Sequence, residues 1–171
     1  MLRFRNPSSS IDTMLASFET LYVALKDKVY FNNDDIAQVL AKSNLMASSG
    51  LTGDVALSLG ANTDKSRDKT YNNAKMFAEI FRLLGLISIV NNVSSNYRFT
   101  YIGDHLVLPT ANKKAIIEQC VLGVNNPNNI IDVSYSEEVR FFSCVLLAME
   151  QLDGYISRDE MILGPMCVSD V

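Results

Sequence analysis

The apolar positions in the first part of the chain recur with the 3.6-residue period of an amphipathic helix. One helix is predicted over residues 12 to 27, with an inner face made of Leu15, Phe18, Leu21, Tyr22 and Leu25. The β-prone piece VYF follows at residues 29 to 31. Asn33 is the predicted cap of a second helix, which has Asp34 and Asp35 in its first turn. A short third helix is expected at about residues 52 to 59.

The pattern between residues 71 and 102 combines a helix with a hairpin. The helix is predicted over residues 71 to 84 and buries Ala74, Phe77, Ile80, Phe81 and Leu84. Gly85 follows at the position where a left-handed cap is favoured. The strand-like runs LISIV and YRFTYI are joined by NNVSSN, whose residues favour a turn. The order helix, helix, short helix, helix, hairpin is typical of a winged helix-turn-helix, which commonly reads DNA with the helix before the wing.

The rest of the chain is predicted to be helical. A helix opened by NKKAIIEQ buries Ile116, Ile117, Cys120, Val121 and Val124, and NNPNN at residues 125 to 129 then breaks the chain. A long apolar helix follows within residues 136 to 154, with Ser134 or Ser136 as its cap, and Ser157 and Glu160 have the spacing of a capping box. We predict a winged-helix domain with an N-terminal arm over residues 1 to 111 and a helical segment over residues 112 to 171.

The helical segment shares a pattern with the start of the chain. A shift of 125 positions places ISRDEM over FNNDDI, and the preceding helix over the first helix. The match lies in pattern more than in identity, so a true repeat and a chance similarity both stay open. A true repeat would make residues 112 to 171 an incomplete second winged-helix module, and the chain would then be part of a longer protein.

Composition and charge narrow the classes of partner. The chain has 171 residues, of which 48% are hydrophobic and 20% are charged, as expected for a globular protein. Its net charge of -4 counts against a non-specific nucleic-acid binder but allows a local basic face. Three cysteines without a CxxC pair, together with one histidine, argue against a zinc site and favour a reducing compartment. We expect a cytoplasmic protein without a membrane partner, because the start is no signal peptide and no long apolar run is present.

The most polar window of the chain, DKSRDKTYNNAK, is the candidate DNA surface. Its cations suit phosphates and its amides suit base edges, and both lie in the first turns of the predicted helix. The DNA-binding candidates are Lys65, Arg67, Lys69, Tyr71, Asn72, Asn73 and Lys75, joined by Arg98 on the second wing strand and Lys113 after the wing. The alternative to a DNA surface is a solvated loop of mixed charge, because Asp64 and Asp68 partly offset the positive charge of this window. The hairpin that follows the helix favours the interpretation of this window as a DNA-binding surface.

No residue pattern indicates a catalytic or metal site within this chain. A lone histidine such as His105 is more often a packing residue than a base. A magnesium-dependent nuclease needs clustered carboxylates and usually a lysine, because the acids hold the cation that activates water. Glu137 and Glu138 lead into a helix without a lysine two positions on. We therefore predict no catalytic residue, no metal ligand and no cofactor in this segment.

The tract over residues 70 to 163 contains four pieces that together resemble a known family of proteins. These pieces are YNNAKMFAEIFRLLG, the hairpin ending in TYIG, the helix KKAIIEQCVLGV and the run EEVRFFSCVLLAMEQLDGYISRDEMIL. The tract resembles the DNA-recognition regions of type IIS restriction endonucleases of the FokI and AlwI kind. The resemblance implies winged-helix modules that recognise an asymmetric site in double-stranded DNA, joined to a separate magnesium-dependent nuclease domain. By position, residues 71 to 84 would be the recognition helix and residues 87 to 101 the wing, with the nuclease outside this chain.

Three hypotheses follow from the sequence. The first is the recognition part of a type II restriction endonuclease, with double-stranded DNA and other domains of the same polypeptide as partners. The second is a winged-helix transcriptional regulator without a nuclease. The third is a winged helix used only for protein interaction, which the acidic net charge would suit.

Overall fold

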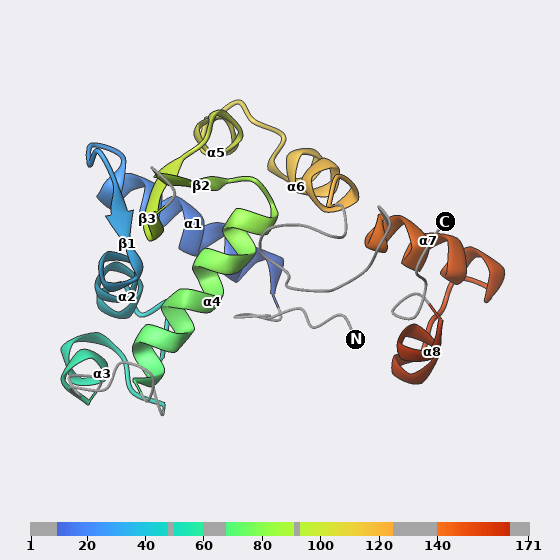
Figure 1. Cartoon of the computed structure of the whole chain (residues 1–171), viewed down its shortest axis with the longest axis horizontal. Helices are drawn as coiled ribbons and strands as arrows, with labels where there is room; N and C mark the ends of the chain where they lie inside the picture. Colours follow the sequence, from blue (N-terminus) through green and yellow to red (C-terminus); the bar gives the residue numbers. More distant parts are fainter. Residues whose placement is uncertain (1–9, 48–49, 60–67, 91–92, 125–139, 165–171) are drawn as a thin grey trace. The chain divides into compact units, whose positions relative to one another are not determined.

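A computed structural model describes residues 10–47, 50–59, 68–90, 93–124 and 140–164 (Figure 1). The chain divides into two compact units, one of Arg5–Ala111 and one of Asn112–Val171 with Met1–Phe4. The described residues form eight helices and one three-stranded antiparallel sheet. The prediction of a mainly helical fold with a small hairpin is therefore confirmed.

The first helix, α1 (Ile11–Leu25), follows the predicted apolar stripe closely. Ser10 caps it, because its side chain accepts a hydrogen bond from the Thr13 amide at 3.3 Å. The buried face contains Phe18, Leu21 and Leu25, as expected, and also Ser17, whereas Leu15 and Tyr22 are only half-buried. The Ser17 hydroxyl donates to the Thr13 carbonyl at 2.7 Å, which satisfies its polar group inside the core.

The cap of the second helix is one residue earlier than predicted. Strand β1 (Phe31–Asn32) leads directly into α2 (Asn33–Lys42), and the cap is Asn32 rather than Asn33. The Asn32 side chain accepts from the amides of Asp34 and Asp35, at 2.9 and 3.0 Å, and Asp35 accepts from the Asn32 amide at 2.9 Å. The extended backbone of Asn32 suits a cap, whereas Asn33 is already helical and its side chain is buried. The short helix α3 (Gly53–Leu59) follows.

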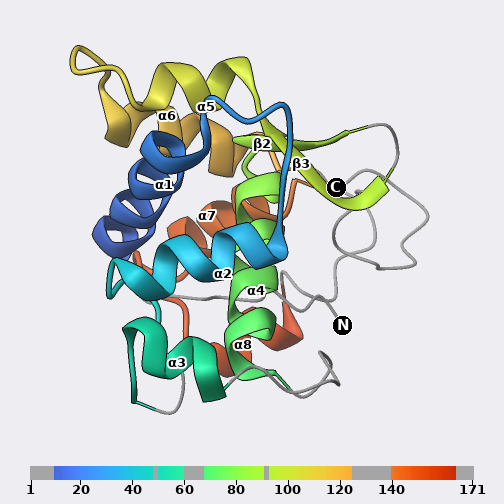
Figure 2. The same cartoon turned by 90° about the vertical axis from the view of Figure 1, so that its left-hand side faces the viewer.

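Helix α4 (Lys69–Leu83) crosses α2 and packs against it (Figure 2). Its cap is Asp68, whose carboxylate accepts from the Tyr71 amide at 3.0 Å. The buried face consists of Thr70, Ala74, Phe77, Ala78 and Phe81. Gly85 has a φ of 70°, as predicted for a left-handed cap, and the Leu86 amide donates back to the Phe81 carbonyl at 2.8 Å.

The hairpin is present, with different limits. Strand β2 (Ile87–Val90) pairs with β3 (Val93–Phe99), and β3 also pairs with β1, so the strand order is β1-β3-β2. Ile87 lies opposite Phe99, and Phe31 lies opposite Tyr97. The prediction placed the second strand at residues 97 to 102, but β3 starts at Val93 within the expected turn. Residues 91 and 92 lie outside the described residues.

The second predicted strand ends early because a short helix, α5 (Tyr101–Leu106), begins after Thr100. The Thr100 hydroxyl accepts from the Gly103 amide at 3.1 Å and donates to the Gly85 carbonyl at 2.6 Å. The TYIG motif is therefore a helix cap rather than the end of a strand. Tyr101 and Ile102 are helical and exposed, so their assignment to the strand was wrong.

Aromatic rings join the elements of this unit into one core. The ring centroid of Phe18 lies 5.1 Å from that of Phe81 and 5.7 Å from that of Phe99, and both contacts are edge-to-face. Phe31 adds a contact to Phe99 at 4.8 Å. Helices α1 and α4 and strands β1 and β3 therefore share one apolar centre, which holds the hairpin against the helices.

The second unit contains α6 (Lys113–Leu122), α7 (Phe141–Gln151) and α8 (Arg158–Leu163). The predicted capping box is confirmed, since Ser157 accepts from the Glu160 amide at 3.2 Å and Glu160 accepts from the Ser157 amide at 2.7 Å. This box stands 125 positions after the box of Asn32 and Asp35. The predicted break at residues 125 to 129, and the cap at Ser134 or Ser136, lie outside the described residues.

Candidate nucleic-acid interface

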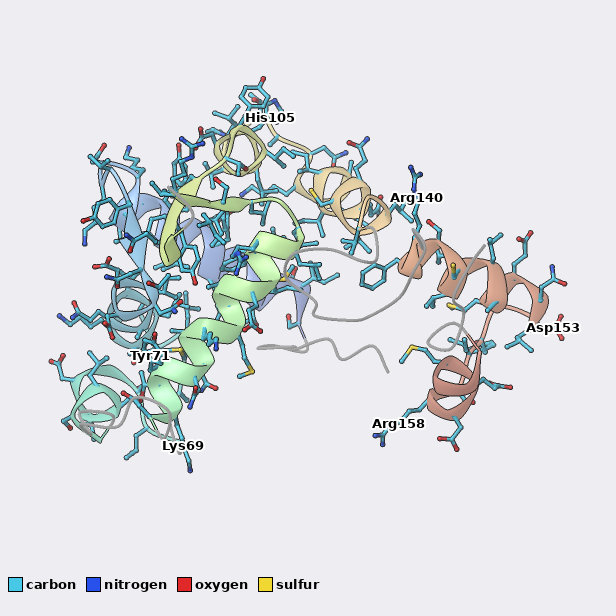
Figure 3. All side chains as sticks on the ribbon, in the orientation of Figure 1. Lys69, Tyr71, His105, Arg140, Asp153 and Arg158 are labelled. Atoms are coloured by element: carbon cyan, nitrogen blue, oxygen red, sulfur yellow. The ribbon has the colours of Figure 1, made fainter. Side chains whose placement is uncertain are left out.

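The outward face of α4 carries polar side chains from its first turns. Lys69, Asn72 and Lys75 are exposed and recur every three residues, opposite the buried stripe that includes Ala74 and Phe77. Figure 3 places Lys69 at the beginning of the helix. This face therefore presents two ammonium groups and one amide along about two turns of helix.

Negative groups limit the positive charge of this face. Asp68 caps the helix at its N-terminus, and Glu79 lies partly exposed one turn beyond Lys75. Arg82, in the last turn, adds a third cation, and this one is only partly exposed. The surface of α4 is thus only mildly basic, so hydrogen bonding must contribute to any recognition of a polyanion.

Asn73 differs from Asn72 in its surroundings. Its side chain is partly buried, and its Nδ2 donates to the Ala47 carbonyl at 3.1 Å. This hydrogen bond ties α4 to the segment that follows α2. The structure gives Asn73 a role within the fold, while Asn72 stands on the exposed face.

Tyr71 lies on the side of α4 that faces α2 (Figure 3). Its hydroxyl accepts a hydrogen bond from Nδ2 of Asn33 at 3.4 Å, which is longer than the roughly 2.7–3.2 Å usual for such bonds. Asn33 is only 4% exposed, and its Oδ1 has no hydrogen-bond partner among the described residues. Tyr71 therefore combines a partly exposed ring with a polar contact inside the unit.

Tyr97, on β3, belongs to the same neighbourhood. Burial raises the pKa of its phenol above the usual 10.0, and Tyr71 and Glu79 raise it further. Arg82 and a hydrogen bond from the Asn33 side chain lower this pKa, but burial outweighs them. No local sequence signal marks Asn33 or Tyr97 as part of a site, because an asparagine at a helix start and a tyrosine in a strand are common without any such role.

The remaining candidates belong to other elements or lie outside the described residues. Arg98 is exposed on β3, and its Nε donates to the Ser88 hydroxyl at 3.4 Å across the β2–β3 pair. Lys113 is in the first turn of α6 and belongs to the other unit. Lys65 and Arg67 lie outside the described residues.

His105 is on α5, exposed, with its ring centroid 6.1 Å from that of Tyr101. In the described parts of the chain, no three His, Cys, Asp or Glu side chains gather in a way that could hold a metal ion. Within the same residues, no helix has both the length and the apolar character needed to cross a membrane.

Comparison of the chain with protein-family models, with curated proteins and with solved structures gives no match.

Proposed function

We propose that this chain is a winged helix that recognises double-stranded DNA, with α4 as the recognition helix and the β2–β3 hairpin as the wing. The observation that carries the proposal is the arrangement around α4. A strand between α1 and α2 closes the sheet in the order β1-β3-β2, and a helix with a polar outer face directly precedes the hairpin. Helix α3 is an additional element between α2 and α4.

The dimensions and chemistry of α4 suit the major groove. That groove is about 12 Å wide and admits an α-helix. Lys69 and Lys75 would contact phosphates on its two sides, since ammonium groups neutralise backbone charge without regard to sequence. Asn72 would read a base edge, because an amide can donate to and accept from adenine at once.

The wing would hold the DNA backbone. Arg98 is exposed on β3, and its pairing with Ser88 orients the guanidinium on the outer side of the sheet. A cation in this position would contact phosphate rather than bases. Lys65 and Arg67, just before the cap of α4, are proposed to extend the same set of phosphate contacts.

A narrower proposal concerns the biological setting. The sequence resemblance over residues 70 to 163 supports a recognition segment of a type IIS-like restriction endonuclease, whose magnesium-dependent nuclease would lie outside this chain. The test is magnesium-dependent cleavage of DNA by the product of the full open reading frame. Binding without cleavage, and without an acid-acid-lysine cluster in that reading frame, would favour a transcriptional regulator instead.

The DNA proposal is tested by selecting preferred duplexes from a random library and measuring affinity as a function of salt. We expect tighter binding to the selected duplex, and an affinity that falls steeply with salt because counterions are released. Lys75→Ala should make the slope of log K against log salt shallower by about 0.9 for each phosphate that the variant no longer neutralises. Lys42→Ala is the matched control, since Lys42 is an exposed lysine at the end of α2.

Asn72→Ala separates base reading from phosphate binding. We expect the selected duplex to bind ~1–3 kcal/mol more weakly and the sequence preference to relax, with little change on a scrambled duplex. Lys69→Ala should weaken both duplexes alike. If neither variant changes either affinity, α4 is not the recognition helix.

Protein interaction is the second candidate, and an exposed apolar surface favours it. Val23 is 74% exposed on α1, and a shallow depression there is lined by Glu19, Thr20, Val23 and Ala24. Absence of DNA binding at every salt concentration, together with a partner whose binding Val23→Asp abolishes, would support this function in place of DNA recognition.

A further inference from the structure

Three polar side chains from three elements meet inside the first unit. Asn33 stands at the start of α2, Tyr71 in the first turns of α4, and Tyr97 in the middle of β3. Nδ2 of Asn33 donates to the Tyr71 hydroxyl at 3.4 Å, and the Asn33 side chain also hydrogen-bonds the Tyr97 phenol. We refer to Asn33, Tyr71 and Tyr97 as the polar junction.

The polar junction is buried at a cost in stability. Asn33 is 4% exposed and Tyr97 is 3% exposed. Oδ1 of Asn33 lacks a hydrogen-bond partner among the described residues, and a buried acceptor without a partner disfavours the folded state. An apolar group of similar size would avoid this penalty. The presence of the Asn33 side chain at this buried position therefore needs an explanation other than stability.

The position of Asn33 in the chain supplies that explanation. Asn33 follows β1 directly, and β1 pairs with β3 through Phe31 and Tyr97. Helices α2 and α4 pack together, and they bury apolar groups such as Ile36, Leu40 and Phe77, which constrain distance more than direction. Hydrogen bonds are directional, so the polar junction can select one orientation of α4 against the strand.

We propose that the polar junction sets the orientation of α4 relative to the β2–β3 hairpin, and thereby the sequence preference of the DNA-binding surface. Asn33 and Tyr97 are positioning residues that need not touch DNA, and Tyr71 acts through its hydroxyl from within the recognition helix. The inference rests on the proposed function, since it assigns the junction to recognition by α4 and the wing. A small change in the angle of α4 would move Asn72 away from a base edge while leaving the flexible lysines within reach of phosphates.

The test uses the full chain with the double variant Asn33→Leu/Tyr97→Phe, and with Tyr71→Phe. Replacing both partners with apolar groups removes the unpaired acceptor and the phenol together, so the double variant should remain as stable as the wild type in urea unfolding. Tyr101→Phe is the matched control, because Tyr101 is 82% exposed on α5. Residual dipolar couplings of the α4 and β2–β3 amides report the relative orientation of these elements with or without DNA.

We expect the couplings of the double variant to require a changed angle between α4 and the hairpin. The ratio of affinities for the selected and scrambled duplexes should fall about tenfold, while the affinity for the scrambled duplex stays within about twofold. Tyr71→Phe should show a smaller shift in the same direction, and Tyr101→Phe should show none. A stable double variant with unchanged couplings and an unchanged ratio would overturn the proposal.

The two proposals can fail separately. If the wild type binds no duplex, the DNA function fails, and the couplings alone then decide whether the junction sets the orientation of α4. If the wild type prefers a duplex and the double variant retains both preference and orientation, DNA recognition stands and the role of the junction is refuted.

Discussion

Two single residues, Gly103 and Thr100, determine how closely α5 packs against the start of the hairpin. Gly103, in α5, lies against the Leu86 backbone, and a Cβ at this position would stand 2.3 Å from the Leu86 carbonyl oxygen and 3.1 Å from Cζ of Phe18. Thr100 fixes the same corner from the other side through its hydrogen bonds to Gly85 and Gly103. Thr100 and Gly103 therefore allow α5 to pack closely against the residue before β2.

Gly103→Ala is expected to destabilise the first unit by about 3 kcal/mol, because the methyl group would meet backbone atoms that cannot rotate away. Urea unfolding measures the change. Gly85→Ala is the comparison, since its Cβ would meet nothing closer than 3.9 Å and only its φ of 70° is strained, at about 1 kcal/mol. Equal destabilisation by the two substitutions would contradict the close approach at Gly103.

At the scale of elements, two helices begin with the same device. Asn32 with Asp35 opens α2, and Ser157 with Glu160 opens α8, each by a reciprocal capping box. Such boxes satisfy amides that a helix start leaves unpaired, and they also place a carboxylate near the positive end of the helix dipole. The start of each helix is therefore determined locally, independent of what packs against the helix.

The capping box of α8 predicts a pH dependence. Hydrogen bonds from the Ser157 side chain and amide hold the pKa of Glu160 below its usual 4.5. A carboxyl whose pKa is lowered by folding stabilises the helix above its usual pKa, and this contribution disappears as the pH falls through the lowered value. Amide-exchange protection of α8 should therefore decrease as the pH is lowered from about 5 to about 3.

Glu160→Gln is the control for this prediction. A glutamine at the same position can still accept from the Ser157 amide but does not titrate. Its exchange protection, corrected for the intrinsic pH dependence, should stay constant over the same range. A decrease identical to that of the wild type would mean that another group is responsible.

At the scale of the molecule, each unit has its own apolar centre. Phe18 is 1% exposed and contacts the rings of Phe81 and Phe99, so it links α1, α4 and β3 within the first unit. In the second unit, Ile117 on α6 and Cys144 on α7 are buried. Disruption of one centre should therefore leave the other in place.

Phe18→Ala is expected to destabilise the first unit by about 4 kcal/mol, because it leaves a cavity beneath α4 and the sheet. Hydrogen exchange followed by NMR measures the effect for each helix. Protection should fall in α1, α2 and α4 while that of α7 is unchanged. A parallel fall in α7 would show that the two units unfold together.

The amino-acid sequence by itself determined the features that neighbouring residues control. The stripes of α1 and α4, the left-handed Gly85 and the box of Ser157 and Glu160 all depend on residues within about two helical turns, so periodicity and capping rules predict them. The predicted cap of α2 was one residue late, because Asn32 and Asn33 can both cap a helix. The predicted limits of β3 were wrong by a few residues, because the residues at its ends can either continue a strand or leave it.

Only the tertiary structure decided which polar residues face inward. Asn33 meets Tyr71 across 38 positions, and Asn73 meets Ala47 across 26. Helical periodicity places Asn72 opposite the buried stripe of α4 and Asn73 at the flank of that stripe, but only the packing of the segment after α2 against this flank gives Asn73 its hydrogen-bond partner. The sequence alone suggests the candidate DNA surface as a window of polar residues, whereas the division of its described residues, 68 to 75, into exposed and structural ones required the packing of α2, α4 and β3.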